Sequence, residues 1–289
     1  MAIAASNGSS ISSSELFLLL PPGTFTSSEG LEQFVSNDQV LRNEIAVSRG
    51  EFAPQGLENL THDQAEQVFL TSRRVQLAQL FADQFVKACP WIRLVAISGS
   101  TAYGRTKARD DVDFFLVTRR NRLWITLLCG LVLSKIQRIR DRSIPVFCFN
   151  RILDESQCEV TFRTEQEPLL AREALSMRVL KGDSYYHGLV KSSSWMAELF
   201  PARYDQALAG GPVRETYVSN RGCGLWSIAN WIAFGALVPY ATLVSQIRNR
   251  RLRQSGNTEA LFRTVIRRGF FAYESRKFDQ LKETYRGAF

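Results

Sequence analysis

Apolar residues recur at helical spacing in the segment from about residue 62 to residue 88, the first regular pattern along the chain. Leu77, Leu80, Phe81 and Phe85 are separated by three, one and four positions, as one buried face of an α-helix requires. Pro90 disfavours a helical conformation at the residue before it, so we expect this helix to end near Ala88.

The segment before that helix, residues 1–60, is rich in serine, glycine and other polar residues and shows little periodicity. Such composition is typical of connecting segments rather than of packed elements. We therefore expect a loosely structured arm with one short helix near residues 31–41. The amino terminus has no basic stretch before its short apolar run, so a secretory signal is not expected.

Strand-like and helix-like patterns alternate after residue 90. RLVAISGS and VDFFLVT predict two strands joined through a turn and a short helix, an almost entirely apolar run predicts a helix over 123–139, and IPVFCFNRIL predicts a third strand. This order predicts an α+β fold in which a small mixed β-sheet, within a core at 61–163, is flanked by helices. The remainder, 164–289, predicts a mostly helical C-terminal region, including an amphipathic helix in the basic and aromatic run that starts near Phe262.

Two acidic residues, Asp111 and Asp113, stand at the start of the otherwise apolar second strand. Residues two apart in a strand project to the same side, here about 7 Å apart along the backbone. Like charges held together near a core cost free energy unless a cation is shared between them. Mg²⁺ prefers one or two carboxylates together with phosphate oxygens and water. The sequence therefore predicts that Asp111 and Asp113 bind Mg²⁺.

A glycine-serine turn, Gly99-Ser100, follows the first strand. Glycine allows the backbone to approach a phosphate closely, and free N–H groups at the start of a helix favour an anion. We therefore expect Gly99 and Ser100 to bind the phosphates of a nucleotide whose metal ions are held by the aspartates. Arg105 and Lys107 lie between the two halves of this pattern and are further candidates for phosphate contact, although a solvated helix face explains them equally well.

Gly99-Ser100, a gap of about ten residues that contains Ala102 and Gly104, and then Asp111-Val112-Asp113 together resemble the signature of the DNA polymerase beta-like nucleotidyltransferase superfamily. The match covers a few dozen residues. The downstream run LAREALSMRVLKGDSYYHGLVKSSSWMAELFP is in addition similar to a group of bacterial stand-alone nucleotidyltransferase-domain proteins.

The resemblance implies transfer of a nucleoside monophosphate from a nucleoside triphosphate to an acceptor, with release of pyrophosphate and with two Mg²⁺ ions bound by Asp111 and Asp113. It also implies a third carboxylate on a neighbouring strand, and here the sequence departs from the family pattern. IPVFCFNRIL contains no acid, and the nearest candidates are Asp154, Glu155 and Glu159, for which a place in a loop or on the surface is at least as good an interpretation.

The chain of 289 residues carries a formal net charge of +8, which favours polyanionic ligands such as nucleotides, nucleic acid or an anionic membrane face. Its five cysteines contain no CxxC pair, so they predict free thiols in a reducing compartment rather than a disulfide framework or a zinc site. The chain has two histidines, so the sequence gives little support for a histidine-based metal site or a Ser-His-Asp triad. We expect a cytoplasmic protein.

A stretch without charge, residues 225–247, is long enough to cross a bilayer. Four arginines follow it directly, and a single crossing would leave only one of its flanks in the cytoplasm. A buried helix, an in-plane helix on the inner face of a membrane through residues 225–253, a helix that packs in a homodimer, and a true span remain open at this point.

Two functions follow as alternatives. The first is a Mg²⁺-dependent nucleotidyltransferase acting on a small molecule, a nucleic acid or a protein. The second is a nucleotide-binding regulatory protein that lacks the third carboxylate and therefore does not catalyse nucleotidyl transfer. A membrane-associated scaffold built on residues 225–247 is a third alternative. The sequence selects neither the acceptor nor the base.

Overall fold

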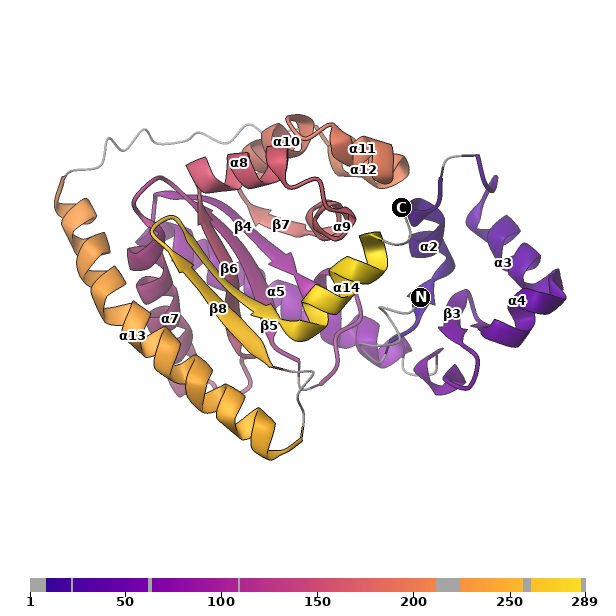
Figure 1. The fold of residues 1–289 in the computed structure, drawn as a ribbon, viewed down its shortest axis with the longest axis horizontal. Helices are drawn as coiled ribbons and strands as arrows, with labels where there is room; N and C mark the ends of the chain where they lie inside the picture. Colours follow the sequence, from indigo (N-terminus) through magenta and orange to yellow (C-terminus); the bar gives the residue numbers. More distant parts are fainter. Residues whose placement is uncertain are drawn as a thin grey trace.

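The structure, a computed structural model, describes residues 9–21, 23–61, 64–108, 110–211, 224–256 and 261–286 (Figure 1). A six-stranded mixed sheet has the order β7-β4-β5-β6-β9-β8. Its strands are β4 (Ile92–Ser98), β5 (Val112–Thr118), β6 (Phe147–Asp154), β7 (Arg178–Lys181), β8 (Phe262–Arg267) and β9 (Phe270–Ser275). β5 and β6 are parallel, and every other neighbouring pair is antiparallel.

Helices cover both faces of this sheet (Figure 1). The helices of the described residues, apart from those before residue 60, are α5 (Gln64–Ala88), α6 (Gly99–Ala102), α7 (Leu123–Arg140), α8 (Glu155–Thr164), α9 (Pro168–Ser176), α10 (Asp183–Lys191), α11 (Trp195–Leu199), α12 (Pro201–Leu208), α13 (Gly224–Gln254) and α14 (Arg276–Arg286). The fold is therefore α+β with a mixed sheet, as the sequence predicts.

The alternation of side chains along β4 divides the core into two layers. Val95 and Ile97 pack with α5, α7 and α13, whereas Leu94 and Ala96 pack with α8, α9, α10 and α11. Both sets are fully buried, because a strand in the middle of a sheet covered on both faces exposes neither side.

The C-terminal region is mostly helical but also supplies half of the sheet. β7 pairs with β4, and the hairpin of β8 and β9 pairs with β6. The run from Phe262, expected as an amphipathic helix, forms this hairpin first and becomes helical only at α14. That expectation was wrong because β-branched and aromatic residues on both sides of Arg268-Gly269 favour a tight strand pair.

The segment before residue 60, expected as a loose arm, is folded over its described residues. A three-stranded antiparallel sheet and three helices share their own small apolar core. The elements are β1 (Ile11–Ser12), α2 (Ser13–Leu19), α3 (Ser28–Asn37), α4 (Gln39–Glu44), β2 (Ile45–Ser48) and β3 (Glu51–Pro54), followed by a short 3₁₀ turn η1 (Glu58–Thr61). Polar caps such as Asp38, whose carboxylate accepts from the N–H groups of Val40 and Leu41, explain why a polar segment still forms helices.

The four cysteines within the described residues carry free thiols, and they are Cys89, Cys129, Cys148 and Cys158. The fifth, Cys223, lies outside those residues.

Candidate functional site: a glycine turn against a buried aspartate

The turn at Gly99 brings the backbone directly against the carboxylate of Asp113. Ser98, the last residue of β4, is paired across the sheet with Asp113 of β5. Gly99 has φ +65°, and a Cβ atom built on it would lie 2.6 Å from Asp113 Oδ2. Glycine is therefore required here twice, for the left-handed backbone and for the space that the carboxylate occupies.

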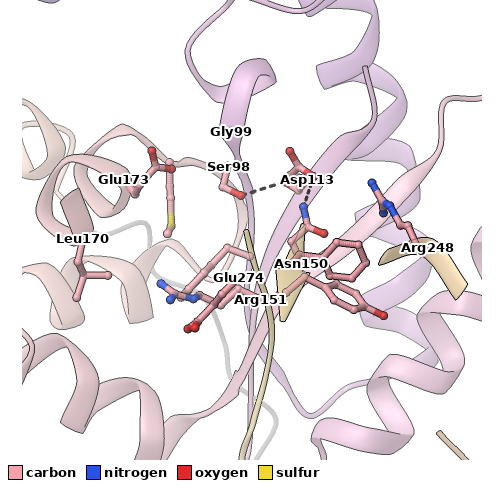
Figure 2. Close-up of a pocket in the computed structure, with 13 residues that line it drawn as sticks. Ser98, Gly99, Asp113, Asn150, Arg151, Leu170, Glu173, Arg248 and Glu274 are labelled. Carbon is pink, nitrogen blue, oxygen red and sulfur yellow. Dashed lines mark hydrogen bonds between the residues drawn. The ribbon is translucent and has the colours of Figure 1, made fainter. Parts of the chain in front are cut away.

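A cavity of about 340 Å³ opens at this point (Figure 2). Side chains from five further elements line it, namely Asn150 and Arg151 of β6, Glu173 of α9, Arg248 of α13, Phe262 of β8 and Glu274 of β9. Segments far apart in the sequence thus build one cavity around the glycine turn. Its mixture of carboxylates and arginines suits a ligand that combines a cation with anionic groups.

Burial raises the pKa of Asp113 to about 7, and the negative charges of Asp111, Glu173 and Asp110 add to this effect. A hydrogen bond from Asn150 Nδ2 to Asp113 Oδ1 acts in the opposite direction. Ionisation of the Asp113 carboxyl group in this environment therefore costs free energy. A cation in the cavity would offset that cost, so the donor chemistry at Asp113 fits a divalent metal ion.

Asp111 faces a different cavity from Asp113. It lines a second cavity of about 300 Å³ together with Asp110 and the arginines Arg73, Arg74, Arg138 and Arg142. The thiol of Cys148 connects the two acids, because it donates to Asp111 Oδ2 at 3.2 Å and its pKa is raised by burial and by the charges of both Asp111 and Asp113. The expected arrangement, with both acids on one side of a strand, is therefore not what the structure shows, because β5 begins at Val112 and the two acids line separate cavities.

The side chain of Ser100 helps to hold the loop between β4 and β5. Its hydroxyl donates to Asp110 Oδ2 at 3.2 Å, and the backbone N–H of Lys107 donates to the same oxygen at 2.9 Å. The side chain of Lys107 is exposed and does not line the cavity at Gly99. In this conformation both residues hold the loop between β4 and β5 through Asp110, and neither side chain faces the cavity of Asp113.

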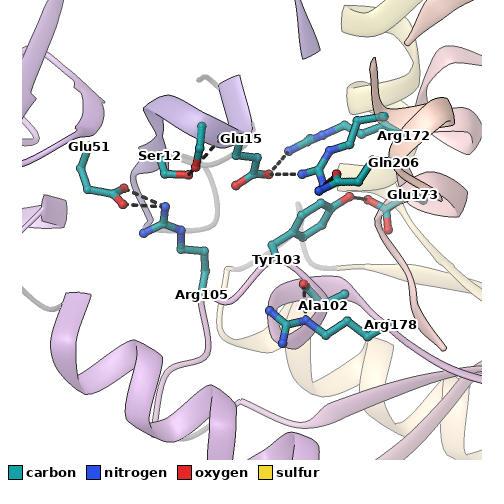
Figure 3. Close-up of polar contacts among 12 residues, drawn as sticks. Ser12, Glu15, Glu51, Ala102, Tyr103, Arg105, Arg172, Glu173, Arg178 and Gln206 are labelled. Atoms are coloured by element: carbon teal, nitrogen blue, oxygen red, sulfur yellow. Dashed lines mark hydrogen bonds and ion pairs between the residues drawn. The ribbon is translucent and has the colours of Figure 1, made fainter. Parts of the chain in front are cut away.

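Arg105, expected near the phosphates, instead binds the folded segment before residue 60, which we call the N-terminal unit. Its guanidinium pairs with Glu51 of β3 at 2.8 Å, and the side chains are 10% and 1% exposed (Figure 3). A second ionic contact joins the same two parts of the molecule at Glu15, which lies 3.7 Å from Arg172 of α9. Arg105 therefore joins the loop of the motif to β3 and does not line the cavity at Gly99.

The three acids considered as a third carboxylate lie elsewhere. Asp154 caps α8 by accepting from the N–H of Gln157, Glu155 pairs with Arg93 at 3.0 Å, and Glu159 lines a separate cavity beside α10. The β6 side chain that reaches Asp113 is the amide of Asn150. None of these three acids lines the cavity at Gly99.

Glu173 is an acid of this cavity that sequence reasoning did not find. Its Oε1 accepts a hydrogen bond of 2.6 Å from the hydroxyl of Tyr103, and the guanidinium of Arg172 lies 4.9 Å from the centre of the Tyr103 ring (Figure 3). Tyr103 is thus packed locally. Glu173 reaches the cavity because α9 packs on the face of the sheet that carries Leu94, Ala96 and Phe115, which spacing along the chain does not reveal.

The described residues contain no group of three or more histidine, cysteine, aspartate or glutamate side chains placed to hold a metal ion by themselves. Metal binding in the cavity at Gly99 would rely on Asp113 together with ligand oxygens. The chain matches no family model, no curated protein and no solved structure.

Proposed function

We propose that the cavity at Gly99 and Asp113 binds a Mg²⁺-bound nucleoside triphosphate, and that the chain transfers its nucleoside monophosphate to an acceptor hydroxyl with release of pyrophosphate. The observation that carries the proposal is the contact between the Gly99 backbone and the Asp113 carboxylate at the mouth of a 340 Å³ cavity. A phosphate that approaches the glycine backbone also approaches the carboxylate, and only a bridging cation makes that arrangement favourable.

Asp113 is the residue of this cavity that would hold Mg²⁺, and Asp111, which lines the neighbouring cavity, would add its charge nearby. The raised pKa of Asp113 reflects first its burial and then the charges of Asp111, Glu173 and Asp110, and the charges of Asp111 and Asp113 both act on Cys148. When bound, Mg²⁺ supplies charge neutralisation for the triphosphate and the transferred phosphoryl group. Arg248 and Arg151, which line the same cavity, provide fixed positive charge for the leaving pyrophosphate.

The transfer requires one proton acceptor in the cavity. The acceptor oxygen forms a bond to the α-phosphorus, the bond from that phosphorus to the bridging oxygen breaks, and pyrophosphate leaves with the electron pair. The hydroxyl proton passes to a carboxylate. We assign this role to Glu173, which shares the cavity with Asp113 and is oriented by the Tyr103 hydroxyl.

The test is incubation of the purified chain with Mg²⁺, each α-labelled nucleoside triphosphate in turn and an extract of the source cells. We expect label in an acceptor with the wild type, none with Asp113→Asn, and a large loss with Glu173→Gln despite retained nucleotide binding. Glu198→Gln, on α11, is the matched control for the glutamate change. Equal labelling by wild type and Asp113→Asn would refute the transferase proposal.

Asn150 favours a second candidate, a nucleotide-binding protein without turnover. Its amide is the β6 group in contact with Asp113, and an amide cannot accept a proton as a carboxylate does. In that case the wild type binds the nucleotide and transfers nothing, whereas Asn150→Asp gains transfer. A wild type that already transfers label removes this second candidate.

A further inference from the structure

Helix α13 is apolar on the side that faces away from the protein as well as on the side that faces it. Its inner side consists of small and aliphatic side chains such as Ala233, Leu237 and Ala241, which pack on the sheet layer. The exposed apolar side chains on the rest of its surface include Leu225, Ile228, Ile232, Leu243 and Ile247, with exposed fractions from 44% to 71%. A helix that is apolar all round is normally buried on all sides, in a protein or a membrane.

The neighbouring helix α7 adds a second apolar stripe. Leu128, Val132, Ile136 and Ile139 follow one another at intervals of three or four residues and are all exposed. The two helices pack against each other on the same face of the sheet (Figure 1). We call the combined exposed apolar side chains of α7 and α13 the α7–α13 surface. An apolar area of this extent on a globular chain indicates an interaction site.

The charged side chains of α7 and α13 themselves are all positive. Neither helix contains an aspartate or glutamate. Arg138 and Arg140 are in the last turn of α7, and exposed arginines at 250, 251 and 253 end α13. The two helices begin side by side, since Asn230 Oδ1 of α13 accepts from the N–H groups of Trp124 and Ile125.

Polar contacts fix α13 to the protein near both of its ends. Asn230 caps α7 near the start, and near the other end the Asn249 side chain both donates to and accepts from the backbone of Phe262. One side of α13 is therefore held by its own chain. α13 is long and apolar enough to cross a bilayer, but in this fold only its outer side is available for lipid.

We propose that the α7–α13 surface lies in the plane of a membrane and binds a bilayer that contains anionic lipids. The apolar side chains enter the boundary of the acyl chains, and the arginines at the helix ends contact the anionic headgroups. Charge decides between a lipid surface and a second copy of this chain, because a second copy would present arginines and no carboxylate from these two helices. This inference does not depend on the proposed transfer reaction.

Membrane binding would bring the candidate site close to the headgroups. Arg248 belongs to the basic end of α13 and also lines the cavity at Asp113. Arg138 and Arg142, at and after the end of α7, line the cavity at Asp111. Both cavities therefore lie at the arginine-rich end of the α7–α13 surface.

The test is flotation of the full chain with vesicles, one set of phosphatidylcholine alone and one of equal parts phosphatidylcholine and phosphatidylglycerol. We expect the wild type to float with the mixed vesicles only. Ile232→Glu/Leu243→Glu lowers the apparent affinity for mixed vesicles by about tenfold or more, since two exposed anchors become charged. Val40→Glu/Val160→Glu, on α4 and α8, changes charge equally at exposed apolar positions and leaves binding unchanged.

A second pair of variants separates the electrostatic contribution. Arg250→Gln/Arg251→Gln/Arg253→Gln weakens binding to mixed vesicles by about a hundredfold. Arg42→Gln/Arg163→Gln/Lys191→Gln, which removes the same charge from other exposed positions, has little effect.

Four results would overturn the inference. The first is a wild type that stays unbound to mixed vesicles, and the second is equal binding by Ile232→Glu/Leu243→Glu and its control. The third is a lipid-free dimer in sedimentation that Ile232→Glu/Leu243→Glu converts to a monomer, because the surface would then pair two copies. Retention of the chain in vesicles after an alkaline carbonate wash would show a span and would also contradict in-plane binding.

Discussion

The two aspartates of the motif lie at two cavities whose balance of charge differs. Asp113 lines a cavity with two further acids, Glu173 and Glu274, and two arginines, Arg151 and Arg248, whereas Asp111 lines one with Asp110 and four arginines, Arg73, Arg74, Arg138 and Arg142. Burial and acidic neighbours raise the pKa of Asp113 to about 7. The excess of acids and the raised pKa of Asp113 favour a cation in the first cavity, and the excess of arginines favours anions in the second.

The Asp-x-Asp pattern places the two acids side by side in the sequence, but their two cavities suit two different roles, metal binding and the attraction of anions. The cavity of Asp113 has the features of a metal-dependent site, with a close backbone approach and acids in excess. The cavity of Asp111 has the features of an electrostatic guide at the arginine-rich end of α7. Variants in the first should change the metal dependence of binding, and variants in the second should change its salt dependence.

The largest effect is expected from Gly99→Ala. The new Cβ would lie 2.6 Å from Asp113 Oδ2 at a left-handed φ, so the carboxylate has to move and the turn is strained by about 1–3 kcal/mol. We expect Mg²⁺-dependent nucleotide binding to fall by about a hundredfold, which corresponds to the loss of one well-placed charged contact. Binding calorimetry measures the affinity.

Gly104→Ala is the matched control for Gly99→Ala. Gly104 also has a left-handed φ, +76°, but the nearest atom to its added Cβ is Arg178 Nη2 at 3.6 Å. The control should lose a similar amount of stability in thermal unfolding and keep nucleotide binding. Equal loss of binding in both variants would mean that the strain of the turn, and not the crowding of Asp113, decides affinity.

A smaller effect is expected from Asn150→Asp on metal-dependent stability. The change replaces a hydrogen-bond donor to Asp113 with another carboxylate, so without metal the folded state should lose about 1–3 kcal/mol. Mg²⁺ should offset this loss, and the increase in Tm on adding Mg²⁺ should be larger for Asn150→Asp than for the wild type. A Tm response to Mg²⁺ that is the same in both chains contradicts metal binding at Asp113.

The smallest effect is expected at the arginine cavity. Arg138→Gln/Arg142→Gln removes two exposed charges beside Asp111, and exposed charge pairs contribute about 0.2–1 kcal/mol each. Nucleotide affinity should fall a few-fold at low salt and hardly at high salt, with the Mg²⁺ requirement unchanged. Arg42→Gln/Arg163→Gln is the control of equal charge. A loss that persists at high salt would mean that these arginines contact the nucleotide directly.

The local motif and its strands could be predicted from the sequence because they depend on short-range patterns. The turn at Gly99, the strand after Asp111 and the helix over 123–139 all follow from neighbouring residues, and the structure places them as expected. The three additional strands could not be found in this way. β7 is only four residues long, and β8 and β9 join β6 from more than a hundred residues away.

The residues that line the cavity at Gly99 come together through tertiary contacts, which the spacing of residues along the sequence does not reveal. Glu173 and Arg248 come from α9 and α13, which belong to the two different core layers and each supply a side chain to the cavity. Arg105 was assigned to phosphate by its position in the motif, but a folded N-terminal unit provides Glu51 as its partner. The β6 residue that contacts Asp113 is the amide Asn150, and the acids that share its cavity, Glu173 and Glu274, come from α9 and β9.

The most direct test of the central claim is equilibrium binding of a non-hydrolysable nucleoside triphosphate to the wild type and to Asp113→Asn, each with Mg²⁺ and with a chelator. We predict binding by the wild type that requires Mg²⁺, and a loss of that requirement together with most of the affinity in Asp113→Asn. Binding of equal strength in all four measurements would contradict a metal-dependent nucleotide site at Gly99 and Asp113.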